Sequence, residues 1–128
     1  MMTAYDIYKR TCSLMFEREG EDRAFFENFI GILNSLICEA LPYENSVRRS
    51  LGEDELLLPP EVSDINDAVD MCEEICGIAL PYGVASYFFR DDGEMYNSEV
   101  YRNRFANALH EAAKVSLGEV EDIYGEEI

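Results

Sequence analysis

The chain has 128 residues, of which 27 are acidic and 10 are lysine or arginine, giving a formal net charge of −17. A surface of that sign repels phosphate groups, which argues against sequence-specific nucleic-acid binding and against attachment to anionic membranes. Hydrophobic residues make up 48% of the chain, which argues against disorder and supports one domain with a modest core. Long stretches of helical periodicity predict an all-α fold, a small bundle of about four helices.

The first expected helix covers residues 3–19. Thr3 and Asp6 have the spacing of an N-terminal capping box, with aspartate in place of the usual glutamate. Gly20 is suited to end the helix, because glycine readily adopts the left-handed conformation found just past a helix C-terminus. The apolar stripe of this helix comprises Tyr5, Tyr8, Cys12 and Met15 or Phe16.

The second expected helix covers residues 22–41 and ends at Pro42. Its apolar positions occupy more than half of the circumference, so it needs neighbours on two sides. In a small monomer one side would lack a partner, and we therefore expect part of this helix to pack against another subunit. The apolar positions are Phe25, Phe26, Phe29, Ile30, Leu33, Leu36, Ile37 and Ala40, and Glu27, Asn28, Asn34 and Glu39 are expected in solvent.

Residues 42–69 form a long connection, and a connection of this length inside a compact domain is usually functional. Residues 46–51 suggest a short helical turn. The run Leu56, Leu57 and Leu58, ended by two prolines, predicts an edge strand or an extended arm. These three leucines are candidate contacts to another subunit or a partner. Arg48 and Arg49 are expected either to contact carboxylates of a neighbouring subunit or to lie in a solvated turn.

Residues 71–92, MCEEICGIALPYGVASYFFRDD, form the longest apolar run and predict the central helix. Pro81 should interrupt it, because proline lacks the N–H and clashes with the carbonyl four residues earlier. That earlier residue is Gly77, which can tilt away at little steric cost. The pair therefore predicts a kinked central helix, and Asp91-Asp92-Gly93 predicts the turn that follows it.

The last expected helix runs from Glu94 or Ser98 to residue 117, and Gly118 ends it. Residues 1–118 then form a single helical domain, and residues 119–128 form an acidic C-terminal tail. The three spaced apolar residues of this tail are candidate contacts to a partner: Val120, Ile123 and Tyr124.

Compartment and membrane association follow from the same residues. The N-terminal residues show no basic region followed by an apolar core, so no signal peptide is expected. The 71–92 run carries acids, an arginine and a proline, so it is not expected to cross a membrane. The cysteines at positions 12, 38, 72 and 76 fall on expected apolar helix faces and are interpreted as reduced core thiols of a cytoplasmic protein.

Candidate catalytic groups are sparse. Cys72 and Cys76 share a helix face, but a zinc site needs four ligands and the only histidine, His110, is distant in sequence. No pattern pairs His110 with Cys12 or Cys38 as a nucleophile and base. Adjacent carboxylates are numerous, but none is marked by a neighbouring motif as a metal site. We therefore expect no enzyme activity, no metal and no cofactor.

Residues 80–92, LPYGVASYFFRDD, resemble the "LPYGLA-x-x-L-x-x-D-D" helix of small head–tail connector (neck or adaptor) proteins of tailed bacteriophages and prophages. In those proteins a helix with an "F-x-x-R-Y/F-x-x-A" pattern follows, matched here by Arg104, Phe105 and Ala108. LPYEN at 41–45 and GEVEDIYG at 118–125 are also similar, so the resemblance covers most of the chain from residue 40. The departures are Val84 and the aromatic pair at 88–89.

This resemblance implies a structural virion protein whose helical protomers assemble into a ring, commonly twelve-fold. The ring would lie beneath the portal protein, extend the DNA channel and join the head to the tail-completion or stopper proteins. Duplex DNA would pass through the lumen without sequence-specific binding, and an acidic lining would keep it from adhering. The protein would belong to the virion neck and be assembled in the cytoplasm of the bacterial host.

Two other functions are compatible with the sequence. An acidic regulatory or inhibitor protein could imitate DNA and occupy a basic surface of a host enzyme; carboxylates spaced along one exposed face would mark it. A small metal-dependent hydrolase would instead need a cluster of convergent carboxylates.

Overall fold

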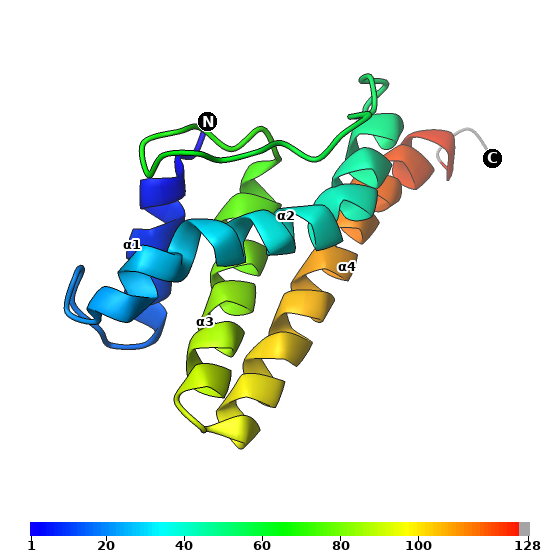
Figure 1. Cartoon of the computed structure of the whole chain (residues 1–128). Coiled ribbons are helices and arrows are strands. Elements are labelled where there is room, and N and C mark those ends of the chain that lie inside the picture. The colour runs from blue at the N-terminus through cyan, green and yellow to red at the C-terminus, as the bar shows by residue number, and fades with distance from the viewer. Residues whose placement is uncertain (126–128) are drawn as a thin grey trace.

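A computed structural model describes the backbone of residues 1–125 and the side chains of residues 1–114. The described chain confirms an all-α fold, and its single β pairing is an isolated bridge between Thr3 and Ala68. The elements are α1 (Ala4–Leu14), α2 (Arg23–Ser50), the π-helical segment η1 (Ile75–Ala79), α3 (Leu80–Asp91) and α4 (Met95–Gly125). Figure 1 shows α2 crossing the α3–α4 pair, with α1 beside α3.

The N-terminus of α1 has the predicted capping box. The Thr3 side chain accepts a hydrogen bond from the Asp6 backbone N–H, and the Asp6 carboxylate accepts one from the Thr3 backbone N–H. The predicted end at residue 19 is wrong, because α1 stops at Leu14. Phe16 adopts a left-handed conformation, with φ +57°, and turns the chain out of the helix before Gly20 is reached.

The second helix does not end at Pro42. α2 continues to Ser50, and Figure 1 shows its C-terminal turns running in a different direction from its first turns. Pro42 leaves the Cys38 carbonyl without its helical donor, but both residues lie on the exposed face, where water can hydrate that carbonyl. Val47 and Glu44 lie on the opposite face of the added turns, and both are buried. The burial of these two side chains stabilises the added turns by more than Pro42 destabilises the helix.

The length and composition of α2 also match those of a membrane-crossing helix. Its most apolar 18-residue window has a mean hydropathy of 1.3, and 33% of that window is buried in the fold. Helices that form the core of a folded domain pass the same test. Leu33, Leu36 and Ile37 of α2 are fully buried in the common core.

Pro81 is accommodated by a π-helical turn, and the predicted kink is not confirmed. In η1 the Leu80 backbone N–H bonds to the Ile75 carbonyl, five residues earlier. Because Pro81 has no N–H, it cannot donate a hydrogen bond to the Gly77 carbonyl. That carbonyl instead accepts a hydrogen bond from Arg10 Nη1 at 3.2 Å. A β-carbon on residue 77 would lie 2.7 Å from that nitrogen, so the Arg10 side chain would have to shift.

α3 and α4 form a helical hairpin joined at Asp92-Gly93-Glu94, one residue later than the turn expected at Asp91-Asp92-Gly93. Gly93 has a φ of +79°, which glycine adopts without strain. α4 does not end at Gly118 but continues to Gly125. The predicted boundary between domain and tail at residue 118 stays a prediction, and the side chains of Val120, Ile123 and Tyr124 lie outside the described residues.

Candidate functional site

The non-helical segment that follows α2, residues 51–72, is called the arm, and two asparagines of α2 fix it in place. Asn34 Nδ2 donates to the Val62 carbonyl at 2.8 Å, and the Val62 N–H donates back to Asn34 Oδ1 at 2.9 Å. Asn45 makes the same pair of bonds with Leu56, at 3.0 and 2.8 Å. Each side-chain amide therefore donates one hydrogen bond to the arm backbone and accepts one from it, as the backbone of a neighbouring strand would. This pairing replaces the predicted edge strand, which the structure does not contain.

The apolar tip of the arm lies between these two anchors. The exposed fraction is 95% for Leu57 and 78% for Leu58, whereas Leu56 is half-buried beside its anchor. Pro59 and Pro60 follow and restrict the backbone to extended conformations. We call residues 57–60 the arm tip. Its two leucines are held out in solvent by a backbone that is bonded to α2 on both sides.

The ends of the arm are tied to the last turns of α2 by a charged network. Arg48 Nη2 lies 3.0 Å from Asp70 Oδ1, and Arg48 Nη1 donates to the Asp54 carbonyl at 3.4 Å. Glu44 is buried, and its carboxylate accepts a hydrogen bond from the Cys72 N–H at 2.8 Å. Burial raises the pKa of Glu44, although the Cys72 hydrogen bond and the Arg48 charge act in the opposite direction. The network fixes where the arm leaves α2 and where it re-enters the helical core.

The two arginines expected at a subunit contact both have partners in their own chain. Arg48 bonds Asp70, as described, and Arg49 Nε lies 2.7 Å from Glu55 Oε1. Arg48 is mostly buried against these groups, whereas Arg49 keeps 69% of its side chain exposed. Contact of these side chains with a neighbouring subunit stays a prediction; the structure assigns them to holding the arm.

Replacing Asn45 with alanine tests the anchoring. We expect the free energy of unfolding to fall by about 1 kcal/mol, because the Leu56 N–H and carbonyl both lose a partner. Hydrogen exchange should accelerate at the amide of Leu56 well beyond this global effect. Asn28→Ala is the matched control, since Asn28 is an exposed asparagine of the same helix that bonds only within it. Equal exchange at Leu56 in both variants would contradict the anchoring.

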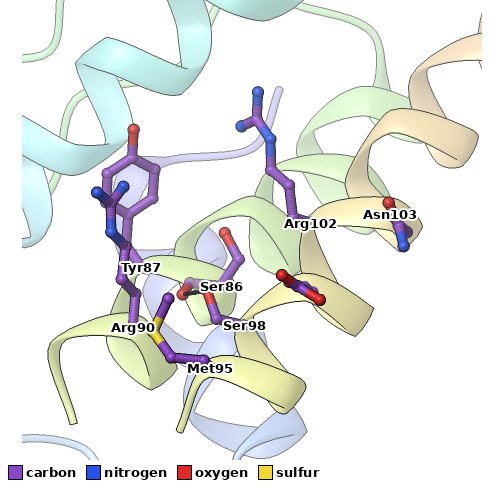
Figure 2. Close-up of a pocket in the computed structure, with 8 residues that line it drawn as sticks. Ser86, Tyr87, Arg90, Met95, Ser98, Arg102 and Asn103 are labelled. Atoms are coloured by element: carbon purple, nitrogen blue, oxygen red, sulfur yellow. Dashed lines mark hydrogen bonds between the residues drawn. The ribbon is translucent and has the colours of Figure 1, made fainter. Parts of the chain in front are cut away.

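A hollow of about 630 Å³ lies between α3 and α4 (Figure 2). Ser98 Oγ donates to the Ser86 carbonyl at 2.8 Å, joining the two helices. Arg102 reaches from α4 to Glu39 of α2 and forms two hydrogen bonds with its carboxylate. Glu39 is exposed, as expected, and its carboxylate links α2 to α4 through Arg102. The lining is Ser86, Tyr87, Arg90, Met95, Ser98, Glu99, Arg102 and Asn103, none of which is a thiol or imidazole.

A second hollow, of about 720 Å³, separates α1 from η1 and the start of α3, and we call it the groove. Its cations are Lys9 and Arg10 of α1, and Ile78 of η1 leaves half of its side chain exposed there. Gly77 and Pro81, predicted for their effect on the backbone, both line it. The complete lining is Met2, Asp6, Lys9, Arg10, Ser13, Leu14, Gly77, Ile78, Pro81 and Tyr82.

The groups considered for catalysis do not converge. Burial raises the pKa of the Cys72 thiol to about 11 and that of Cys76 to about 12, so both stay protonated at neutral pH. His110 pairs with the Tyr43 hydroxyl at 3.3 Å rather than with a cysteine. Cys38 lies on the exposed face of α2, so its predicted place in the core is wrong. Within the described residues, no three His, Cys, Asp or Glu side chains are arranged to hold a metal.

Comparisons with known proteins add no assignment. No protein-family model, curated protein or solved structure matches the chain. Function must therefore be inferred from the arm, the two hollows and the sequence pattern at 80–92.

The sequence indicated some of these features and missed others. The three leucines and the extended course of their segment were visible as an apolar run closed by two prolines. Asn34 was expected in solvent, and Glu44 and Asn45 entered only as part of the LPYEN resemblance, with no role in holding the arm. The groove was also missed, since its cations and Ile78 lie far apart in the chain.

Proposed function

We propose that this protein is a non-catalytic structural subunit that assembles with copies of itself into a ring, as the head–tail connector of a tailed bacteriophage. The observation that carries the proposal is the anchored arm tip. An isolated subunit gains nothing from holding Leu57 and Leu58 in water, because exposed apolar side chains are ordinarily buried by a partner. Two asparagine anchors keep these leucines in a defined position, which suits insertion into a rigid neighbour.

The assignment to a phage connector is supported by the sequence resemblance at 80–92 and by the charge. A ring of subunits that each carry −17 would surround its lumen with a strongly negative potential. Duplex DNA, itself a dense line of negative charge, would not adhere to such a lining during packaging or ejection. The portal protein on one side and a tail-completion or stopper protein on the other are the proposed partners, and the ring is proposed to be twelve-fold.

Native mass spectrometry and electron microscopy test this function directly. We expect a ring from the purified protein, either alone or after mixing with the portal protein of the phage or prophage that encodes it. The ring should dock coaxially on the portal. A strict monomer without portal affinity would refute the proposal. A one-to-one complex with a basic host enzyme, recovered in place of portal binding, would support the DNA-imitating inhibitor instead.

A further inference from the structure

We infer that the arm tip of one subunit docks into the groove between α1 and η1 of the next subunit. The inference rests on the proposed assembly of copies and adds which two surfaces meet. It commits to a second copy of this chain as the occupant of the groove.

The arm tip is an apolar pair between acidic residues. Leu57 and Leu58 are exposed, and the exposed acids Glu53, Asp54 and Glu61 lie within four residues of them. A receiving surface must therefore supply apolar contacts at its centre and positive charge at its edge. Few places in a chain with 27 acidic residues and 10 lysines or arginines can supply the positive charge.

The groove has that combination. Its apolar part is formed by Leu14, Ile78, Pro81 and Tyr82, and α1 contributes two adjacent cations. No carboxylate among the described residues lies within ion-pair distance of Lys9 or Arg10. The one acid in the lining, Asp6, is engaged by the Thr3 backbone N–H and hydroxyl. The groove therefore keeps net positive charge next to exposed apolar surface.

The two surfaces lie on different elements. The arm is bonded along α2, whereas the groove is lined by α1, η1, α3 and Met2 just before α1, and none of its residues belongs to α2 or to the arm. Both anchors hold the arm tip on α2, and in this structure it does not line the groove of its own chain. A contact between different patches on two copies is head-to-tail, and such contacts give a ring when the rotation from copy to copy closes, as the proposed assembly requires.

The test uses two variants that each lack one surface. Leu57→Asp with Leu58→Asp removes the arm tip, and Ile78→Asp places a charge in the groove. We expect each variant alone to be monomeric in sedimentation velocity and native mass spectrometry, under reducing conditions and at concentrations where the unaltered protein assembles. Mixed in equal amounts, the two should form a one-to-one dimer and nothing larger, because one tip and one groove remain intact.

Two further variants separate docking from misfolding. Lys9→Glu changes an exposed groove cation at a position outside the core and should also abolish assembly. Tyr96→Asp changes a residue that is 79% exposed and belongs to neither surface, so it should assemble normally. Circular dichroism should show equal helix content in all variants.

Each other outcome overturns the inference. Assembly of the single-surface variants, or a mixture that stays monomeric while the unaltered protein assembles, would refute the tip-to-groove contact and leave the connector function standing. An unaltered protein that is monomeric at every concentration would refute self-docking through these surfaces. Electron microscopy of the portal complex would then decide the connector function independently.

Discussion

Replacing Gly83 with valine is expected to lower the free energy of unfolding by about 3 kcal/mol. Gly83 lies where α3 passes between α2 and α4. A β-carbon at this position would lie 2.9 Å from Leu36 Cδ2 and 3.0 Å from Phe105 Cδ1. Both neighbours are buried in the common core, so neither can move aside without displacing others. Valine adds two more methyl groups at this crossing and stiffens the side chain.

Urea denaturation of Gly83→Val and Gly31→Ala measures this effect against a matched control. Gly31 is a helical glycine on the exposed face of α2, and a β-carbon there would meet no atom within 4 Å. We expect Gly31→Ala to raise the free energy of unfolding by about 0.5–1 kcal/mol through helix propensity alone. A Gly83→Val variant as stable as the unaltered protein would contradict the close crossing. This crossing also explains physically why the LPYG sequence at 80–83 acts as a packing motif.

Replacing Glu44 with alanine is expected to lower the free energy of unfolding by about 2 kcal/mol. The Cys72 N–H would lose its acceptor in a part-buried site, and Arg48 would lose a carboxylate 3.8 Å from its Nε. Glu44→Gln is the matched control, because its amide oxygen can still accept from Cys72. We expect the glutamine variant to be clearly more stable than the alanine variant at pH 7. Equal losses would show that the hydrogen bond to Cys72 contributes little.

The same pair of proteins gives a pH dependence with a definite sign. The folded protein raises the pKa of Glu44 above its usual 4.5, so it binds this proton more tightly than the unfolded chain does. The ionised carboxylate therefore costs stability above the raised pKa, and the cost disappears as pH falls from that pKa towards 4.5. Relative to Glu44→Gln, the unaltered protein should gain stability over that interval. Taking the difference cancels the acids that do not interact with Glu44, whereas Asp70 and Glu53, whose charges help to raise its pKa, contribute to the difference. A difference that does not change with pH would contradict burial of the charge.

Features fixed by neighbouring residues were predictable from the sequence. The Thr3–Asp6 capping box depends on two residues three apart, and the Asp92–Glu94 turn depends on one glycine. The helical periods likewise gave the four helices and the all-α class. In each case the deciding interaction joins residues within about one helical turn of each other, and residues that close in sequence are also close in space.

Features decided by tertiary contacts were not predictable in this way. Pro42 ends a helix in isolation, but here burial of Val47 and Glu44 carries α2 past it. Asn34 has the polarity of a solvent residue, and its true partner, Val62, lies 28 residues away. The groove joins α1 to η1 across more than 60 residues. The sequence therefore indicated the arm tip, which is one short run, but not the surface inferred to receive it.

The spacing of the two anchors sets how far the arm must reach. Asn34 and Asn45 are eleven residues apart on α2, a rise of about 16 Å along a helix. Their partners Leu56 and Val62 are six residues apart, and a chain of that length reaches about 20 Å when fully extended. α2 changes direction between the two asparagines, and the backbone of the segment between the anchors bends at Leu57 and Leu58. The segment therefore meets this reach with a bend that holds the leucines between the anchors. Removing one residue from it would straighten the bend, whereas adding two would leave both anchors intact but let the leucines fold down onto α2.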